Sequence, residues 1–297
     1  MISTRSACWA IAAAVLGAAL ASASAAENGP SPSDIVAGTA LAIGNHARGC
    51  LAGAVPLPFD GVGYQVMRPS RNRFYGHPLA VDFVREFGAA MRAKGWHDLL
   101  IGDLGQPRGG PMGWGHRSHQ TGLDIDIWFL PTSEPLSPRE REEISAVSLV
   151  DEQGTGVNPA TWTAAYVELL HTAADFPQVD RIFVHAAIKQ ELCLSVGDDR
   201  GWLSKIRPWW GHDDHFHVGL RCPDGEAACI DRQPPVPAGD GCDDTLAWWC
   251  SEEAKEKLRE LRAASPRPLT LDDLPPACRS VLAGGEEELV PASGGRY

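Results

Sequence analysis

The chain has 297 residues, a formal net charge of -12, eight cysteines and 44% hydrophobic residues. Its acidic surface argues against nucleic acid and anionic lipid as main partners. The length suits one large domain or two small ones.

Residues 1–26 have the pattern of a secretory signal peptide. Arg5 precedes an apolar run from Ala7 to Ala21, and Ala23-Ser24-Ala25 offers a small-x-small cleavage site. The run is too short for a comfortable membrane span, so a cleaved signal is favoured over an uncleaved anchor. We therefore expect an exported mature chain, residues 27–297, that forms one domain and ends in a proline-rich tail.

The cysteines are expected to form disulfides. Cys8 lies in the expected signal, and seven cysteines remain. They lack the C-x-x-C pairs of structural zinc sites, and export places thiols where they oxidise. Seven is odd, and Cys250, which follows Trp248-Trp249, is interpreted as a buried free thiol.

The elements predicted in chain order indicate an α+β fold. Residues 27–60 are rich in Gly, Ala and Pro and are expected to be irregular. A strand is predicted over 63–67, and a helix over 78–94, where an apolar residue recurs every four positions. The later predictions are a strand over 98–104, a binding-site loop over 106–115, a strand over 123–130, a helix over 158–174, a strand over 179–185, a helix over 186–196, a strand over 215–222 and a charged helix over 252–264. Such helices would flank a mixed, mainly antiparallel sheet.

Two segments carry the candidate chemistry. Residues 116–128 read HRSHQTGLDIDIW and residues 211–218 read GHDDHFHV. His215 and His217 are two residues apart, so both leave the same face of one predicted strand. Asp124 and Asp126 share the polar face of the other strand, and spacing alone does not choose between them.

If the two strands are neighbours, His119, one carboxylate and one histidine of the 215/217 pair can converge on a cation. Two imidazoles and a carboxylate suit zinc and leave a fourth position for water. The other histidine of the pair could then act as general base and general acid. His212 is expected near the site, where it would hold substrate or stabilise an oxyanion. His116 could reach the same ion or another one.

These segments resemble the metal motifs of the penicillin-insensitive murein endopeptidases, which belong to the lysostaphin / D-Ala-D-Ala metallopeptidase / hedgehog group of zinc peptidases. The resemblance includes 116–128 and 215–223, and also RIFV at 181–184, AIKQELC at 187–193 and RPWW at 207–210. It spans roughly residues 44–278. It implies a periplasmic enzyme that cleaves the D-alanyl–meso-diaminopimelyl crosslink of peptidoglycan.

The resemblance also implies a role for each site residue. Zinc would be bound by His119, Asp126 and His217, which selects Asp126 over Asp124. His215 would be the catalytic acid/base, assisted by His212.

Disulfides and a second metal follow from the same resemblance. The implied pairs are Cys50–Cys278, Cys193–Cys242 and Cys222–Cys229. These disulfides would hold the irregular N- and C-terminal segments in place. The family pattern includes a second zinc at a subunit interface, with an Asp-x-x-His motif among its ligands. Here the motif reads Asp151-Glu152-Gln153-Gly154, and glycine offers no ligand. His116 and Asp151 remain candidates for additional ligands, and a homodimer remains a candidate assembly.

Two alternatives stay open at this point. A D-Ala-D-Ala carboxypeptidase of the same metal group would remove a terminal residue instead of opening a crosslink. A non-catalytic zinc or peptidoglycan-binding module would need no positioned base such as His215.

Overall fold

The computed structural model describes residues 36–113, 115–264 and 267–283. The signal predicted over 1–26 therefore lies outside the described residues. Within the described part, no helix combines the length and the apolar character that crossing a bilayer requires.

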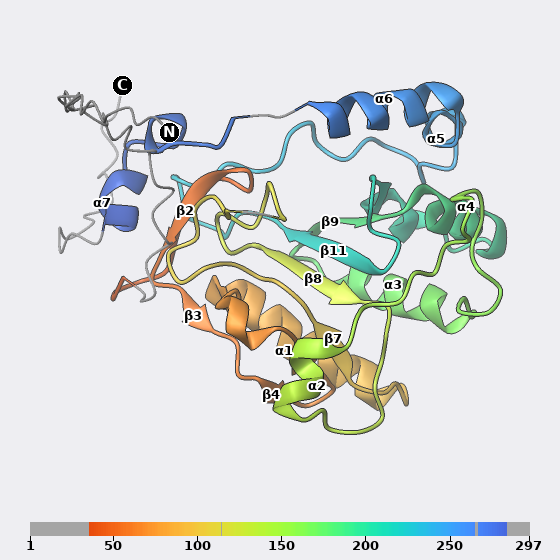
Figure 1. The fold of residues 1–297 in the computed structure, drawn as a ribbon, viewed down its shortest axis with the longest axis horizontal. Coiled ribbons are helices and arrows are strands. Elements are labelled where there is room, and N and C mark those ends of the chain that lie inside the picture. Colours follow the sequence, from red (N-terminus) through yellow and green to blue (C-terminus); the bar gives the residue numbers. More distant parts are fainter. Residues whose placement is uncertain (1–35, 114, 265–266, 284–297) are drawn as a thin grey trace, which may run out of the picture.

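A seven-stranded sheet forms the centre of the fold (Figure 1). Its spatial order is β10-β9-β11-β8-β7-β5-β4. The strands are β4 (Asp60–Gly61), β5 (Tyr64–Val66), β7 (Leu99–Ile101), β8 (Asp124–Trp128), β9 (Val179–Val184), β10 (Ile206–Pro208) and β11 (His215–Leu220). The β10/β9 and β5/β7 pairs are parallel and the other pairs are antiparallel. The predicted α+β class with a mixed, mainly antiparallel sheet is confirmed.

Helices surround this sheet. They are α1 (Pro78–Ala93), α2 (Pro138–Glu143), α3 (Ala165–Asp175), α4 (Ala186–Ser195), α5 (Asp244–Trp249), α6 (Glu252–Ala263) and α7 (Cys278–Ala283), with 3-10 turns η1 (Pro69–Arg71), η2 (Gly201–Lys205) and η3 (Leu271–Asp273). Helix α1 begins as its sequence predicts, because Pro78 is its first residue and the His77 side chain accepts a hydrogen bond from the Leu79 N–H.

One face of the sheet packs against α1 and α3. Phe216 of β11 and Ile127 of β8 are fully buried in this core. Phe87 of α1 meets Phe216 edge-to-face at 6.4 Å, and Phe83 stacks on Phe87. Because side chains alternate along a strand, the polar residues of β8 and β11 face the opposite side. That side is where the candidate site lies.

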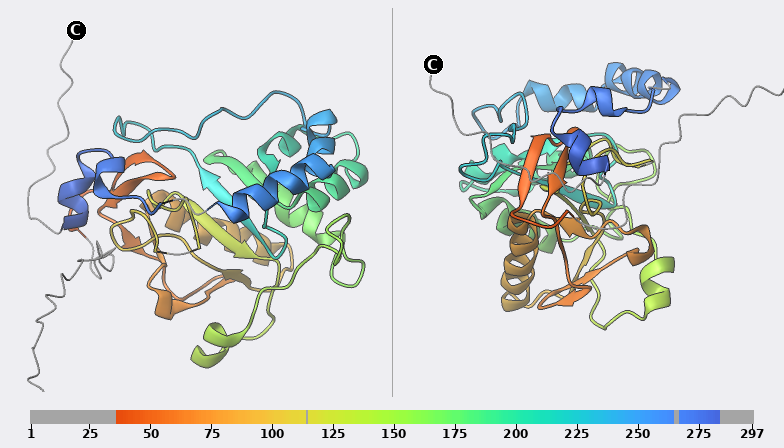
Figure 2. Two further views of the ribbon diagram at one scale, coloured as in Figure 1. Left: turned by 45° about the horizontal axis from the view of Figure 1, so that its top comes forward. Right: turned by 90° about the vertical axis from the view of Figure 1, so that its left-hand side faces the viewer.

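The N-terminal part of the chain is more regular than predicted. β1 (Leu41–Asn45) and β2 (Arg48–Ala52) form an antiparallel hairpin, and β3 (Val55–Pro56) pairs with β6 (Tyr75–Gly76). The prediction of an irregular 27–60 segment is therefore wrong over the hairpin. Ile43 and Cys50 of the hairpin pack with Cys278 of α7 in a small second core, a long-range burial that local composition does not reveal. Figures 1 and 2 show the hairpin beside α7 at one end of the molecule, with α5 and α6 at the other.

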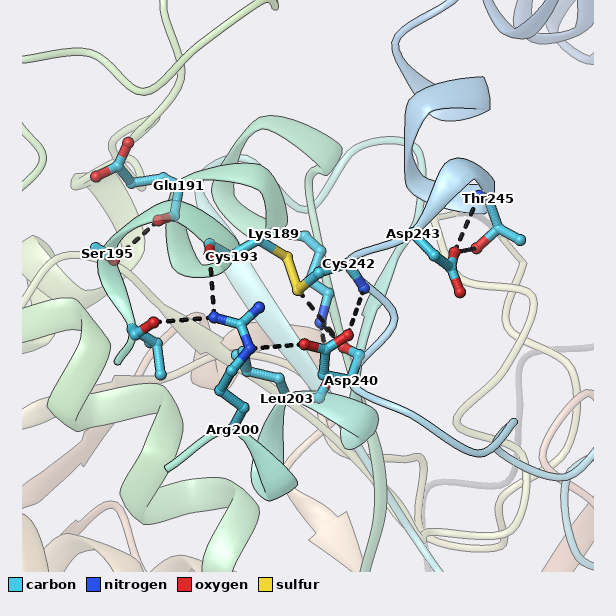
Figure 3. Close-up of a disulfide and its surroundings, with 11 residues drawn as sticks. Lys189, Glu191, Cys193, Ser195, Arg200, Leu203, Asp240, Cys242, Asp243 and Thr245 are labelled. Atoms are coloured by element: carbon cyan, nitrogen blue, oxygen red, sulfur yellow. Dashed lines mark hydrogen bonds and ion pairs between the residues drawn. A yellow bond between two sulfur atoms is a disulfide. The ribbon is translucent and has the colours of Figure 1, made fainter. Parts of the chain in front are cut away.

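All three implied disulfides are present: Cys50–Cys278, Cys193–Cys242 and Cys222–Cys229. Figure 3 shows how Cys193 of α4 is joined to the segment that leads into α5. Cys250 is free, as predicted, but it is exposed and not buried. The helix α5 ends at Trp249, so Cys250 follows it on the surface instead of continuing into the core.

The predicted start of the third helix is also wrong. The sequence predicts a helix over 158–174, whereas α3 begins only at Ala165. Asn158 instead forms a local turn, in which its Oδ1 accepts a hydrogen bond from the Ala160 N–H. Thr161 donates its hydroxyl to the Ser148 carbonyl, which holds the intervening segment out of the helix.

Candidate metal centre and catalytic cleft

The two predicted strands of the site are direct neighbours. β8 and β11 pair antiparallel, and His217 lies opposite Asp126 in the register. Both side chains are buried, and the His217 Nδ1 lies 3.0 Å from Asp126 Oδ1. His215, two residues earlier on β11, points to the same face, and its Nε2 lies 3.9 Å from Asp126 Oδ1.

His119 reaches the same carboxylate from the loop before β8. Its Nδ1 donates to the Leu104 carbonyl at 2.6 Å, which directs Nε2 towards Asp126 Oδ1, 3.4 Å away. Nε2 is buried and has no hydrogen-bond partner in the described part of the chain. A buried ring nitrogen without a partner is costly unless something else binds it.

A tight turn after His119 makes this approach geometrically feasible. His119 has a φ of 67° and Gly122 a φ of 66°. A Cβ on Gly122 would lie 2.4 Å from Leu51 Cδ2 and 2.8 Å from the His77 backbone nitrogen. The glycine of the motif is therefore needed for both backbone conformation and space.

Asp124 is saturated by hydrogen-bond donors. Its Oδ2 accepts from His46 Nδ1 at 2.7 Å and from the His119 backbone N–H at 3.0 Å. Its Oδ1 accepts from His217 Nε2 at 2.7 Å and from Arg232 at 2.6 Å. Burial alone would raise the pKa of Asp124, but the charges of His46 and Arg232 outweigh it and hold the pKa well below its usual range.

These contacts separate the roles of the two aspartates. The oxygens of Asp124 already accept four hydrogen bonds, so Asp124 orients neighbouring groups and does not face the cleft. Asp126 faces the imidazoles of His119, His215 and His217. Burial alone would raise the Asp126 pKa as well, but these neighbours keep it well below its usual range. Asp126 is thus the ionised carboxylate that remains available to a cation.

His116 joins the cluster from the loop. Its Nδ1 lies 3.4 Å from Asp126 Oδ2, and its Nε2 donates to Asp103 Oδ2 at 3.0 Å. His116, His119 and Asp126 each offer a ligand atom, and these atoms lie within 4.8 Å of one another. Asp151 does not join them, because its carboxylate accepts hydrogen bonds from the backbone and hydroxyl of Thr155 in its own turn.

His215 has a carboxylate partner that the sequence reasoning missed. Its Nδ1 donates to Asp214 Oδ1 at 2.6 Å. Burial lowers the pKa of His215, but the carboxylates of Asp126 and Asp214 outweigh this and raise it. The only sequence signal for this pair is that Asp214 directly precedes His215, where strand alternation would send the two side chains to opposite faces.

His212 lies beside the same cleft. Its ring centroid is 4.9 Å from that of His215, and its Nδ1 donates to the Trp210 carbonyl. Burial, together with the charges of His217 and His215, lowers the His212 pKa to about 3, so the ring is neutral. Its φ of 56° lies in the left-handed region, where a residue other than glycine is uncommon.

The donor set fits zinc. His119 offers Nε2, His217 offers Nδ1 because its Nε2 is held by Asp124, and Asp126 offers Oδ1. Two imidazole nitrogens and one carboxylate oxygen are typical of hydrolytic zinc sites. The second hydrogen bond of each ring to a carbonyl or carboxylate is the usual support for a metal-bound histidine.

Comparison with known proteins shows which family the chain belongs to. The sequence pattern of the penicillin-insensitive murein endopeptidases matches residues 42–283. The chain belongs to this family. A penicillin-insensitive murein endopeptidase from Klebsiella pneumoniae is 40% identical over 247 residues, which cover 83% of this chain and 88% of the relative. Relatives of the same name from Haemophilus influenzae (44%; 71% of this chain, 74% of the relative) and Salmonella heidelberg (42%; 83% and 88%) are also similar.

Family membership supports peptidase activity on murein.

A cluster of aromatic residues lies next to the strands of the site. Trp209 and Trp210 follow β10 and contact Trp248 and Trp249 of α5, with ring centroids 4.7–6.2 Å apart. Trp209 also contacts Phe183 of β9. The structure shows a cluster that is only partly buried, with Trp209 47% exposed.

Proposed function

We propose that this protein is a periplasmic, zinc-dependent murein endopeptidase that hydrolyses the D-alanyl–meso-diaminopimelyl crosslink. The observation that carries the proposal is the convergence of His119 Nε2 and His217 Nδ1 on Asp126 Oδ1, at 3.4 and 3.0 Å. His215 lies on the same face without being needed as a ligand. Family membership supplies the substrate class.

In this proposal His119, Asp126 and His217 hold the zinc. When bound there, zinc would lower the pKa of a coordinated water to roughly 7 and polarise the scissile carbonyl. His116 is an additional candidate ligand, since its Nδ1 faces the other oxygen of Asp126. Asp151 lies outside this group, and its candidacy as a second-site ligand stays a prediction.

His215 is the general acid/base of the proposal. Its Nδ1–H is held by Asp214, so Nε2 is the nitrogen that faces the cleft and exchanges a proton. It would accept a proton from the attacking water and return it to the leaving amine. Asp214 positions the ring and favours its protonated form.

His212 is proposed to hold substrate. Since its Nδ1–H donates to the Trp210 carbonyl, the neutral ring presents Nε2 as an acceptor. An acceptor suits a substrate N–H, whereas stabilising an oxyanion would require a protonated ring. The hydrogen bond to Trp210 therefore favours substrate binding over oxyanion stabilisation as the role of His212.

A muropeptide assay tests the function. Zinc-loaded protein should convert purified crosslinked dimers to monomers, EDTA should stop the conversion, and added zinc should restore it. Intact dimers together with trimmed pentapeptides would instead identify a carboxypeptidase. Binding of muropeptides without any product would identify a non-catalytic module.

The ligand set has its own test. Zinc content measured by atomic absorption should fall in His217→Ala and remain near one per chain in His116→Ala. The reverse result would assign the metal to His116, His119 and Asp126 instead.

Export is the remaining part of the proposal, and it rests on the signal pattern of residues 1–26. N-terminal sequencing of protein from a periplasmic fraction should find a new terminus near Ala25 or Ala26. An intact Met1 on membrane-bound protein would support the uncleaved anchor.

Light scattering of the purified protein would show whether it forms the proposed homodimer.

A further inference from the structure

A cavity of about 300 Å³ opens directly beside the candidate metal centre. Asp126 and His215 form one side of its lining, and Arg68 and Arg71 also line it. The roles proposed above make no use of these two arginines. Two positively charged guanidinium groups therefore line a cavity that already contains residues of the candidate metal centre.

Arg68 is held in place without a direct ion pair to the described residues, although Glu142 lies near enough to interact with its charge. Its Nη2 donates to the Ile144 carbonyl at 2.8 Å, and its guanidinium lies 5.8 Å from the ring centroid of Trp128. Its Nε is buried without a hydrogen-bond partner. In the described part of the chain, Arg68 makes no ion pair within 4.0 Å.

The backbone of Arg68 adds a second observation. Its φ of 54° lies in the left-handed region, which is strained for a residue other than glycine. This conformation starts the turn η1, which also carries Arg71. Such local strain is often found where a side chain must be presented to a ligand.

Arg71 completes the pair from the end of η1. Its Nη1 lies 3.4 Å from Asp103 Oδ2, an oxygen that also accepts hydrogen bonds from Arg73 at 2.9 Å and from His116 at 3.0 Å. One third of the Arg71 side chain is exposed. Arg71 therefore makes the longest of the three contacts to Asp103, and its side chain also lines the cavity.

We propose that Arg68, assisted by Arg71, binds the carboxylate on the leaving-group side of the scissile bond. This inference rests on the proposed function. In a D-alanyl–diaminopimelyl crosslink, the carbon that bears the scissile nitrogen also bears a carboxylate. A guanidinium matches a carboxylate through two parallel hydrogen bonds, and the guanidinium-bearing side chain of Arg68 lines the cavity beside Asp126 and His215.

A pair of substrates tests this recognition. One is a crosslinked dimer with a free carboxyl group next to the scissile nitrogen, and the other carries a carboxamide there. Wild-type protein should have a kcat/KM about 10- to 100-fold higher on the free acid, as expected for a charge-assisted contact. Arg68→Gln should lose most of that preference and change the kcat/KM on the amide by less than about threefold. Arg71→Gln should show a smaller loss of the same kind.

Arg139→Gln is the matched control, because Arg139 is an exposed arginine on α2 that pairs with Glu143. It should keep the wild-type preference. Equal losses on both substrates in Arg68→Gln, or no wild-type preference for the acid, would overturn the proposal.

A binding measurement separates this proposal from the proposed function. Calorimetry with His215→Ala protein should show tighter binding of the acid than of the amide, and Arg68→Gln should abolish the difference. If wild-type protein cleaves neither substrate, the endopeptidase proposal fails, while calorimetry still decides the carboxylate contact. Equal affinity for acid and amide would refute that contact whether or not cleavage occurs.

Discussion

Each residue of the candidate site is placed by a specific partner of its ring or carboxylate. The Leu104 carbonyl orients His119, Asp124 orients His217, and Asp214 orients His215. In each case one ring nitrogen is occupied and the other is presented to the cleft. Chemistry that depends on one nitrogen of an imidazole requires such partners, because a free ring can flip.

His215 can be tested without disturbing the proposed ligands. His215→Ala should retain one zinc per chain and reduce the turnover of crosslinked dimers about 10²- to 10⁴-fold, since a general acid/base is lost. Asp214→Asn should cause a smaller reduction, because the ring remains but its ionised partner is gone. Full hydrolysis by His215→Ala would remove His215 from its assigned role. Loss of zinc in the same variant would show that it is a ligand.

Lys189 gives a pH-dependent prediction at a site remote from the cleft. Its side chain is fully buried, and its Nζ donates to the Leu203 and Asp240 carbonyls (Figure 3). Burial, with the nearby charge of Arg207, lowers its pKa from 10.5 to about 7. The unfolded chain therefore binds more protons than the folded chain between about pH 7 and 10.5, so the free energy of unfolding decreases as pH falls through this window.

Lys189→Met should flatten this dependence. Urea denaturation at several pH values from 7 to 10 should give a smaller slope of unfolding free energy against pH than in the wild type. The absolute stability also changes, because two carbonyls lose their donor, so the slope is the relevant readout. Lys257→Met, which removes an exposed lysine from α6, is the control. An unchanged slope in Lys189→Met would show that Lys189 titrates alike in both states.

At the scale of elements, the site depends on one strand pair and one turn. β8 and β11 bring His217 opposite Asp126, and the turn at residues 119–122 delivers His119 onto the same carboxylate. A one-residue slip between the strands would send the histidines to the apolar face. The buried residues on that face, such as Phe216 and Ile127, oppose such a slip.

Gly122→Ala tests the turn. The variant should lose about 3 kcal/mol or more of stability, because it combines backbone strain with contacts at 2.4 and 2.8 Å. It should also bind zinc more weakly, since His119 would be displaced. Gly154→Ala is a matched control with a similar φ of 70° and no atom within 4 Å of the new Cβ, so only the strain of about 1 kcal/mol applies. Equal losses in chemical denaturation would show that space at Gly122 does not matter.

At the scale of the whole molecule, disulfides connect segments that are far apart in the chain. Cys50–Cys278 joins the β1–β2 hairpin to α7 across 228 residues, whereas Cys222–Cys229 closes a loop of 7. The hairpin also contacts the region of the site, because the Gly49 N–H donates to the side chain of Gln120. The two ends of the described chain therefore help to hold the loop that carries His119.

Removing these disulfides should destabilise the protein unequally. Chain entropy predicts a loss of roughly 5 kcal/mol for Cys50→Ser/Cys278→Ser and roughly 2 kcal/mol for Cys222→Ser/Cys229→Ser. Thermal unfolding of both double variants provides the comparison, with each serving as the control for the other. A larger loss from opening the short loop would indicate that native-state packing, and not loop closure, dominates.

Local patterns in the sequence predict the candidate residues and most of the central sheet. Strand alternation placed His215 and His217 on one face, and the histidine- and aspartate-rich motifs identified the family before any coordinates. Short elements such as α2 and α5, and the hairpin at residues 41–52, were missed because their stability comes from distant contacts and not from local periodicity.

The environment of each group depends on contacts between distant parts of the chain. Asp124 and Asp126 are equivalent in a strand pattern, and they differ because His46 and Arg232, from remote parts of the chain, saturate Asp124 alone. The nitrogen that each histidine presents, and the nearness of Arg68 to the cleft, also depend on such contacts. Hydrogen bonds and charges act over a few ångströms in space, whatever the separation along the chain. The motif therefore predicts the candidate ligands, and the fold determines which of their atoms face the cleft.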